Sequence, residues 1–343
     1  MNGKLNHINP RAKQLIKKFK PSKVDVTHWL HQLKKGNTAI LSKAITLIES
    51  KLNTDQSTAQ SLMSKCIAPV DSIRIGITGP PGAGKSTFIE KFGNEILNHT
   101  HSKLAVLTID PSSPDQGGSV LGDKTRMQTL AVNPRVFIRP SAAGRSLGGL
   151  HQNTRDAITL CEYSGFQYII VESVGVGQSE IDIHQIVDIN ILLINPFSGD
   201  ELQGIKRGIN ESADLIIINK DDSGMEQAAK LTKQYYAQAM HFSQHETKLF
   251  TCSSLTGNHI HEIYLYIQSF IEAAKKSKIW DSKRKKQRLF AFNHLIEAKW
   301  INELYTRSDQ KPFKQIVSKI RSSKMDLKKL SDDYIHALKR KIS

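Results

Sequence analysis

Short apolar runs alternate with stretches of helical spacing through the middle of the chain. The runs are S-I-R-I-G-I-T (72–78), L-A-V-L-T-I-D (104–110), R-V-F-I-R (135–139), Y-I-I-V-E (168–172), I-N-I-L-L-I-N (189–195), D-L-I-I-I-N-K (214–220) and K-L-F-T-C-S (248–253). Short strands separated by helix-length spacers are typical of repeated β-α units. The pattern therefore predicts an α/β fold with a mainly parallel sheet flanked by helices.

Both ends of the chain carry helical spacing and no strand pattern. Four apolar residues recur three and four positions apart behind Gly36-Asn37, which can open a helix: Leu41, Ile45, Ile48 and Leu52. Two further apolar stripes follow residue 275: Leu289, Phe292, Ile296 and Trp300, and then Leu327, Leu330, Tyr334 and Leu338. A helix with an apolar face must bury it against the core or against a second subunit. We expect three parts: an N-terminal helical extension (1–70), a central domain (71–274) and a C-terminal helical region (275–343).

The composition is that of an ordinary globular protein. The chain has 343 residues, of which 39% are hydrophobic and 23% charged. No apolar run reaches the roughly 18 residues of a membrane helix, and the N-terminus lacks the apolar core of a secretory signal. The three cysteines, Cys66, Cys161 and Cys252, are far apart, which argues against a disulfide framework. We expect a cytoplasmic protein without a membrane partner.

The net charge of +16 is concentrated at the two ends of the chain. Residues 1–20 contribute +6 and residues 275–343 contribute +13, whereas residues 21–274 carry −3. A strongly basic chain can bind nucleic acid, but a short run such as K-R-K-K (283–286) is more often a solvated helix face. A nucleic-acid-binding protein is therefore the weaker alternative. Binding that survives moderate salt and disappears when residues 275–343 are deleted would favour it.

A phosphate-binding motif follows the first apolar run. The segment G-P-P-G-A-G-K-S-T matches G-x4-G-K-[ST], and we expect a helix to begin near Lys85. The glycines let successive N–H groups converge on phosphate oxygens, while the helix N-terminus adds a favourable dipole. Lys85 would reach the β- and γ-phosphates, and the Ser86 hydroxyl would bind Mg²⁺. The predicted nucleotide-binding residues are Gly79, Pro80, Pro81, Gly82, Ala83, Gly84, Lys85, Ser86 and Thr87.

A guanine-binding motif follows the sixth apolar run. Residues 219–222, N-K-D-D, have the form N-K-x-D. The Asp222 carboxylate can accept from both N1–H and N2–H of guanine, whereas adenine offers no matching donors. Asn219 would brace the loop, and the Lys220 stem would lie over the base. After the next run, the segment Ser253, Ser254 and Leu255 can offer backbone N–H to guanine O6. The predicted nucleotide is GTP.

Mg²⁺ needs oxygen ligands besides Ser86 and the phosphates, usually carboxylates. The candidates are Asp110, Asp123 and Glu172. Asp110 and Glu172 end apolar runs, where parallel sheets place ligand chemistry. Lys206 is a candidate for added positive charge near the phosphates. Each of these four residues could equally be an ordinary surface or strand-end residue, so the residues alone leave their roles open.

A second glycine-rich loop, V-E-S-V-G-V-G-Q-S-E, occupies residues 171–180. Because a phosphate loop already exists at 79–87, we interpret this second loop as a sensor of the γ-phosphate. Gly175 and Gly177 leave its backbone able to rearrange when that phosphate departs. Gln178 is a candidate for orienting the attacking water, although a polar residue at a helix start explains it equally well.

Several long motifs occur in one order along the chain. They are G-I-T-G-P-P-G-A-G-K-S-T, D-P-S-S-P-x-x-G-G-S-x-L-G-D-K-T-R-M, R-P-S at 139–141, V-E-S-V-G-V-G-Q-S-E, G-D-E-L-Q-G-I-K-R-G-I and N-K-x-D. Together they resemble the MeaB/ArgK family of P-loop GTPases, the bacterial relatives of the human methylmalonic aciduria type A protein. The resemblance runs from about residue 36 to about residue 260 and is weaker in the C-terminal helices.

The resemblance implies a role for each candidate residue. The catalytic residues would be Lys85, Asp110, Asp123, Glu172 and Lys206, and the metal ligands would be Ser86, Asp110, Asp123 and Glu172. The guanine contacts would be Asn219, Lys220, Asp222 and Ser253 to Leu255. The implied reaction is Mg²⁺-dependent hydrolysis of GTP to GDP and phosphate.

The resemblance also implies partners. Family members are homodimeric, metallochaperone-type GTPases that serve adenosylcobalamin-dependent mutases, chiefly methylmalonyl-CoA mutase. They gate delivery of the cofactor and protect the mutase from inactivation. The chain departs from the family pattern at Ser173, where threonine is usual, and at N-P-F-S-G (195–199), where small residues are usual. Phe197 adds bulk there. We expect these departures to bear on which partner is bound more than on the nucleotide chemistry.

Two other P-loop classes remain as alternatives. A nickel-insertion GTPase would be expected to carry a histidine-rich tract or paired cysteines, whereas the 13 histidines here are dispersed. A transport-associated ATPase or kinase would require a preference for adenine, which fits N-K-x-D poorly. Comparing hydrolysis of GTP with that of ATP distinguishes a transport-associated ATPase or kinase from the predicted GTPase.

Overall fold

The computed structural model describes residues 24–50, 52–66, 72–110, 127–142, 149–173, 183–196, 213–222, 224–240 and 247–307. Several predictions fall outside these described residues. They concern Asp123, Gly175, Gly177, Gln178, Phe197, Lys206 and the stripe at 327–338. The side chain of Asp110 is also not described, although its backbone is.

All seven apolar runs form strands of one sheet. The strands are β1 (Ile73–Thr78), β2 (Leu104–Asp110), β3 (Val136–Ala142), β4 (Tyr168–Ser173), β5 (Ile189–Ile194), β6 (Leu215–Ile218) and β7 (Lys248–Thr251). Their order is β3-β2-β4-β1-β5-β6-β7, and each pair of neighbours is parallel. The predicted α/β fold is therefore confirmed. Pro140, which cannot donate a backbone hydrogen bond, lies in β3 at one edge of the sheet.

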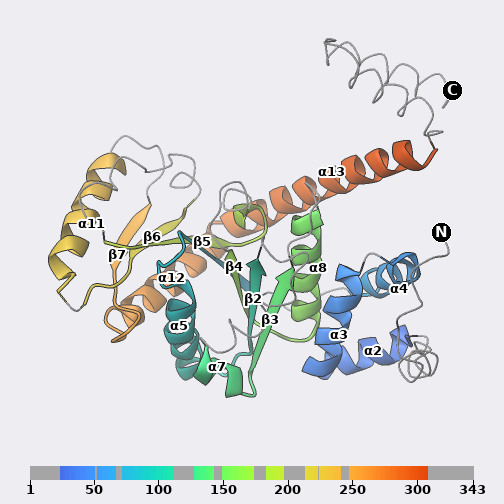
Figure 1. Cartoon of the computed structure of the whole chain (residues 1–343), viewed down its shortest axis with the longest axis horizontal. Coiled ribbons are helices and arrows are strands. Elements are labelled where there is room, and N and C mark those ends of the chain that lie inside the picture. Colours follow the sequence, from blue (N-terminus) through green and yellow to red (C-terminus); the bar gives the residue numbers. More distant parts are fainter. Residues whose placement is uncertain are drawn as a thin grey trace, which may run out of the picture.

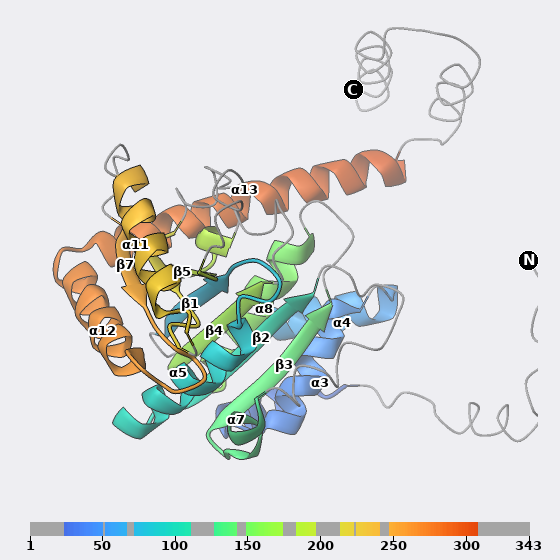
Figure 2. The ribbon, with the colours of Figure 1, turned by 60° about the vertical axis from the view of Figure 1, so that its left-hand side comes forward.

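Helices cover both faces of the sheet (Figure 2). One face packs against α5 (Lys85–His99), α7 (Gln128–Val132) and α12 (Ile260–Lys276). The other face packs against α2 (Val26–Lys34), α3 (Thr38–Glu49), α4 (Asn53–Met63), α8 (Gly149–Tyr163), η1 (Ile183–Gln185) and α11 (Glu226–Met240). Alternate residues of one strand serve the two faces: Leu104 and Val106 join the first core, and Ala105 and Leu107 the second.

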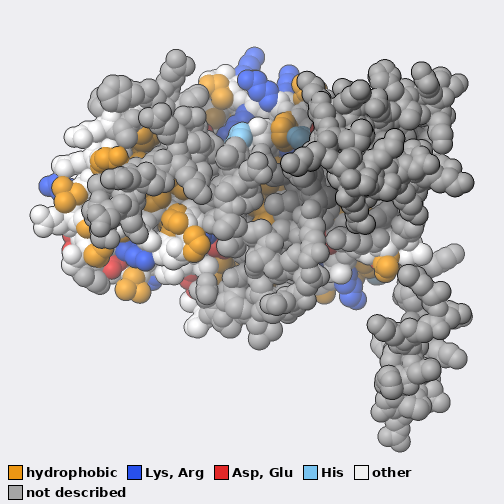
Figure 3. All heavy atoms as spheres, turned by 45° about the horizontal axis from the view of Figure 1, so that its top comes forward, with side chains coloured by type: hydrophobic (Ala, Val, Ile, Leu, Met, Phe, Trp, Pro, Cys, Tyr) orange, Lys and Arg blue, Asp and Glu red, His pale blue; other side chains and the backbone are white. Residues whose placement is uncertain are grey.

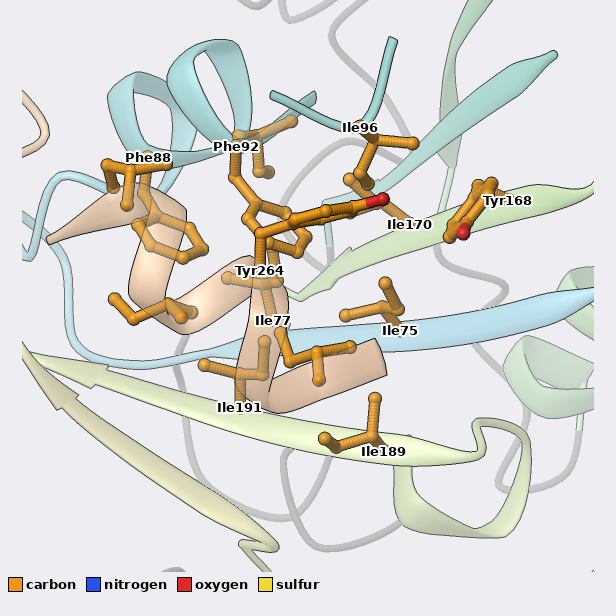
Figure 4. Packing of buried hydrophobic residues seen from close by; sticks show 14 of the residues in the cluster. Ile75, Ile77, Phe88, Phe92, Ile96, Tyr168, Ile170, Ile189, Ile191 and Tyr264 are labelled. Carbon is orange, nitrogen blue, oxygen red and sulfur yellow. The ribbon is translucent and has the colours of Figure 1, made fainter. Parts of the chain in front are cut away.

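The first core is built around aromatic and branched side chains. Phe88 and Phe92 of α5 stack with their ring centroids 5.4 Å apart. Figure 4 shows these rings with Tyr264 of α12, above Ile75 and Ile77 of β1. All five side chains are buried. Their packing fixes the helix that follows the phosphate motif against the centre of the sheet.

The predicted N-terminal helix is confirmed between Thr38 and Glu49. Asn37 caps it, because its Oδ1 accepts hydrogen bonds from Ala39 N at 3.1 Å and Ile40 N at 3.2 Å. Leu41 and Ile45 are fully buried, as the stripe predicts. Leu52 was wrongly included in that stripe. The helix ends at Glu49, and Leu52 precedes α4 with 65% of its surface exposed.

The C-terminal part of the described chain is the long helix α13 (Ile279–Arg307). Its first turns lie beside the sheet, and its second half extends away from the other described elements (Figure 1). The apolar stripe predicted on this helix is exposed: Leu289 61%, Phe292 58%, Ile296 40% and Trp300 59%. The predicted domain limits at 70 and 274 stay predictions.

The basic run at 283–286 is only partly a solvated face. Arg284 is 14% exposed at its side chain and binds both carboxylate oxygens of Asp188, at 2.5 and 2.6 Å. Lys283 donates to Asp188 O at 2.6 Å and to Asp214 Oδ2 at 3.3 Å. Only Lys285 and Lys286 are exposed. Half of the run therefore holds α13 on the sheet, which leaves less of it for nucleic acid.

The described residues on the side shown in Figure 3 carry no continuous basic face. On the side shown in Figure 3, Lys and Arg side chains of the described residues form small separate groups among neutral ones.

None of the helices in the described part of the chain combines the length and the apolar character needed to span a bilayer.

Candidate functional site

Five strands bring the predicted site residues to the same edge of the sheet, at their carboxyl ends. The phosphate motif follows β1, Asp110 ends β2, and Glu172 is the next-to-last residue of β4. Asn219 follows β6, and the segment 252–255 follows β7. Parallel α/β sheets bind ligands at this edge. Segments that are up to about 180 positions apart in the sequence therefore meet at one place.

The phosphate loop needs glycine at defined positions. Gly79, Gly82 and Gly84 have φ angles of 142°, 81° and 85°, a region that side chains disfavour. A Cβ at Gly79 would lie 2.0 Å from the carbonyl oxygen of Leu193 in β5. A Cβ at Gly84 would lie 2.5 Å from Asn219 Nδ2. The loop thus passes against β5 on one side and against the N-K-x-D segment on the other.

Lys85 begins α5 and is only 7% exposed. Its Nζ donates to Gly79 O at 2.7 Å and to Pro80 O at 3.1 Å, so the ammonium group is held across the loop that contains it. The α5 N-terminus carries the partial positive charge of the helix dipole. Positive charge is therefore concentrated where the motif predicts phosphate.

Glu172 faces the first turn of α5. Its side chain is buried in the middle of the sheet, between Ile77 of β1 and Thr108 of β2 in the strand register. Ser86 Oγ donates to Glu172 Oε1 at 3.4 Å. A hydroxyl and a carboxylate oxygen close together are hard donors suited to Mg²⁺. The structure thus brings together two of the four predicted metal ligands, Ser86 and Glu172.

The other predicted acids are not placed by side chain. The backbone of Asp110 pairs with Ala142 at the same edge of the sheet, one strand away from Glu172. Asp123 and Lys206 lie outside the described residues. Their roles stay predictions.

Asn219 ties the phosphate loop to the segment after β7. Its Nδ2 donates to Ala83 O at 2.8 Å. Its Oδ1 accepts from Ser254 N at 3.0 Å and from Ser254 Oγ at 2.7 Å. Asn219 is 2% exposed, so these bonds are shielded from water. One amide group thus positions both loops that the sequence assigns to the nucleotide.

The other predicted guanine contacts lie next to Asn219 in the chain or in the segment after β7. Asp222 Oδ2 accepts a short hydrogen bond from Ser253 Oγ, which orients the carboxylate. Lys220 is exposed and has a φ of 60°, which is strained for a residue with a side chain. Leu255 is 69% exposed, whereas Ser253 and Ser254 are buried. Strained non-glycine backbone of this kind is concentrated at ligand sites.

Cys252 is a contributor that the sequence did not indicate. Its Sγ lies 3.5 Å from Asn219 Oδ1. Burial raises the pKa of the Cys252 thiol to about 12, so the thiol stays protonated and can donate to the amide oxygen. Leu193 was also missed: its carbonyl closes the space at Gly79. Neither contact has a sequence signal, since each depends on the strand order.

Comparisons with known proteins identify the family of the chain. The model of the family described as "Methylmalonyl Co-A mutase-associated GTPase MeaB" matches residues 41–309. The chain is 40% identical over 287 residues to GTPase ArgK of Escherichia coli (strain K12), covering 82% of this chain and 86% of that protein. It is 40% identical over 282 residues to the mitochondrial methylmalonic aciduria type A homolog of Mus musculus, covering 77% and 68%.

A solved structure is also similar. It is described as the crystal structure of LAO/AO transport system kinase, with a TM-score of 0.72 and 29% sequence identity. The similarity covers 93% of this chain and 99% of that chain. The fold is thus similar over nearly the whole length of both chains.

Proposed function

The chain belongs to the MeaB family of P-loop GTPases, and on that premise we propose that its GTP hydrolysis gates or protects the loading of an adenosylcobalamin-dependent mutase. The enzyme activity is that of a GTPase. The partner proposal rests on the family description, which names methylmalonyl-CoA mutase. The observation that carries the nucleotide chemistry is the bridge from Asn219 to both nucleotide loops.

The residues divide the work of hydrolysis among them. The amides of the phosphate loop and Lys85 hold the charge on the β- and γ-phosphates. Phosphate oxygens are stronger acceptors for Lys85 Nζ than the two carbonyls it now contacts, because they carry negative charge. Ser86 and Glu172 would hold Mg²⁺. Asp110 and Asp123 are the further ligands that the family resemblance implies, and Lys206 is the proposed source of added positive charge. When bound, Mg²⁺ would neutralise part of the negative charge of the phosphates.

Guanine selection belongs to Asp222 in this proposal. Asp222→Asn replaces an acceptor by a donor facing N1–H and N2–H, so GTP affinity should fall by about 10- to 100-fold and xanthosine triphosphate should be favoured. Binding titrations of both nucleotides measure this change. Asp221→Asn, on the neighbouring residue, is the matched control and should keep the preference for GTP. Equal preference for GTP in the Asp222 variant would contradict the guanine assignment.

The mutase proposal is tested by co-purification. The tagged chain is recovered from its native cell with GDP and with a non-hydrolysable GTP analogue, and the bound proteins are identified. We expect an adenosylcobalamin-dependent mutase, in amounts that differ between the two nucleotides. Recovery of no cobalamin enzyme in either state would overturn the partner proposal and leave the GTPase activity untouched.

The exposed stripe of α13 supports a homodimer. Leu289, Phe292, Ile296 and Trp300 are 40–61% exposed and lie three or four positions apart on one helix. An apolar stripe of this spacing packs well against a copy of itself. We assign the second copy to this face. The transport-coupled and nucleic-acid alternatives have no comparable feature among the described residues.

A further inference from the structure

We propose that Glu95, His99 and His261 form a binding site for a divalent transition-metal ion of the Zn²⁺ type, separate from the nucleotide site. Each residue offers one ligand atom, and these atoms all lie within 4.8 Å of one another. Glu95 and His99 are one turn apart at the end of α5, and His261 is in the first turn of α12. His99 lies about 21 Å along α5 from Lys85, at 1.5 Å per residue.

The distances suit a small ion. Glu95 Oε1 is 2.8 Å from His99 Nε2 and 2.7 Å from His261 Nδ1. Ligand atoms around a tetrahedral Zn²⁺, with bonds of about 2.0–2.1 Å, stand about 3.4 Å apart. Each contact to Glu95 therefore needs to widen by roughly 0.6–0.7 Å, which side-chain rotation provides.

The two imidazole rings rest on a rigid support. The His99 ring stacks on Tyr264, with centroids 5.2 Å apart and planes at 20°, and lies 5.0 Å from the His261 ring. Tyr264 is 7% exposed and belongs to the core with Phe92 and Ile96, as Figure 4 shows. Such support fixes ligand directions before an ion arrives, which raises affinity.

The donor set selects the ion. Two imidazole nitrogens and one carboxylate oxygen suit Zn²⁺, and also Co²⁺, Ni²⁺ and Cu²⁺. Mg²⁺ and Ca²⁺ prefer oxygen ligands and are excluded by this set. The side chains are partly exposed, at 21% for Glu95, 44% for His99 and 53% for His261, so water can complete the coordination. The site would therefore bind metal without competing for the Mg²⁺ that accompanies GTP.

The alternative interpretation is that the Glu95 carboxylate only accepts hydrogen bonds from the His99 and His261 rings. It predicts no metal affinity. A metal site predicts an additional link between α5 and α12. The helix α5 follows the phosphate loop, and α12 follows the 252–257 segment. A bound ion would hold these two helices together and stabilise the folded chain, since a ligand that binds only the folded state raises its stability.

The test is a calorimetric Zn²⁺ titration of the full chain, stripped of metal and nucleotide. We expect His99→Ala, His261→Ala and Glu95→Gln each to lose one Zn²⁺ equivalent per chain relative to the unchanged protein. His259→Ala is the matched control, because His259 lies two residues from His261 and contacts Glu262 at 2.6 Å instead. This control should keep the full number of equivalents, and excess Mg²⁺ should not displace the ion.

Two further readouts keep the result unambiguous. Co²⁺ should give the visible absorption of a nitrogen- and oxygen-ligated ion in the unchanged protein and lose it in the His261 variant. Zn²⁺ should raise the Tm of the unchanged protein and of His259→Ala, but not of the three site variants. Equal Zn²⁺ stoichiometry in the unchanged protein and in His261→Ala would overturn the proposal, as would the absence of any Zn²⁺ binding.

Discussion

At Gly79 the chain has room for a hydrogen atom and for nothing larger. The neighbouring Leu193 carbonyl is backbone of a central strand and cannot move aside without disturbing the sheet. Gly82 also has a positive φ, but no atom lies within 4 Å of the Cβ it would carry. A side chain at Gly79 would meet both a steric clash and an unfavourable φ, whereas a side chain at Gly82 would meet only the unfavourable φ.

Gly79→Ala should destabilise the nucleotide-free chain more than Gly82→Ala does. Both changes carry the strain of a positive φ, roughly 1–2 kcal/mol, and only the first adds a clash. Urea unfolding followed by circular dichroism measures the difference. Equal losses in the two variants would show that the strand behind Gly79 yields easily.

The carboxyl group of Asp156, on α8, gives the fold a pH dependence. Burial raises the pKa of Asp156 to about 6, although Gln152 Nε2 donates to its Oδ1 at 2.8 Å. The folded chain therefore binds this proton more tightly than the unfolded chain does. The stability that the proton contributes is present below about pH 4 and is lost as the pH rises through about 6.

Asp156→Asn should raise the free energy of unfolding at pH 8 by on the order of 1–3 kcal/mol. The effect should shrink toward zero below about pH 4, because the carboxyl is then neutral in both the folded and the unfolded chain. Asparagine keeps the acceptor for Gln152. Urea unfolding at pH 5 and pH 8 measures the change, with the exposed Asp281→Asn as control. An equal effect at both pH values would rule out this carboxyl as the source.

Among the elements, α13 is held on the sheet by a buried network of charges. Arg284 joins Asp188 to Glu162 and also donates to Ser72 O at 2.9 Å. Arg74 pairs with Glu162 at 2.7 Å, so the network reaches from the last described helix to the first strand. Buried pairs add little net stability over apolar side chains, but losing one partner leaves a charge uncompensated.

Arg284→Met should lower the free energy of unfolding by about 3–5 kcal/mol, since Asp188 and Glu162 lose a buried cation. Arg288→Met, at an exposed position of the same helix, should change it by less than about 0.5 kcal/mol. Urea unfolding compares the two variants. Limited proteolysis should show earlier cleavage within α13 in the Arg284 variant alone. Similar stability of both variants would mean that the network does not hold the helix.

The elements themselves could be predicted from sequence because their signals are local. Each apolar run became a strand, Asn37 caps a helix, and α5 begins at Lys85. The contacts that assemble the elements could not be predicted. Asn219 meets Ala83 across 136 positions, and Arg284 meets Asp188 across 96. Such pairs depend on strand order, which no short pattern encodes.

The candidate site divides in the same way. The phosphate loop and the N-K-x-D segment were predicted by their motifs, because backbone geometry there demands particular residues. The cluster at Glu95, His99 and His261 had no motif, since two helices supply it. Lys283 and Arg284 appeared in the sequence as surface charge, and only the packing of α13 shows their inward direction.

For the whole molecule, the exposed stripe of α13 is the feature that a monomer does not explain. Replacing Phe292 and Trp300 together by glutamate should convert a dimer into a monomer, because charges in an apolar interface are strongly unfavourable. Light scattering after size-exclusion chromatography measures the mass. Glu297→Gln, an exposed change on the same helix, is the control. A monomeric unchanged protein, or a dimeric double variant, would contradict the assignment.

The contacts that hold the first turns of α13 on the sheet also have a mechanical consequence. Lys283 and Gln287 donate hydrogen bonds to the backbone of Asp188, His184 and Val187, which lie four to eight positions after the predicted γ-phosphate sensor (171–180) in the chain. The helix has 29 residues, so it is about 44 Å long at 1.5 Å per residue. About 30 Å of the helix lies beyond Gln287, so a tilt of about 5° at these contacts would carry the far end through about 3 Å. A rotation too small to alter the core would thus move the far end of α13 by a distance comparable with the size of an amino-acid side chain.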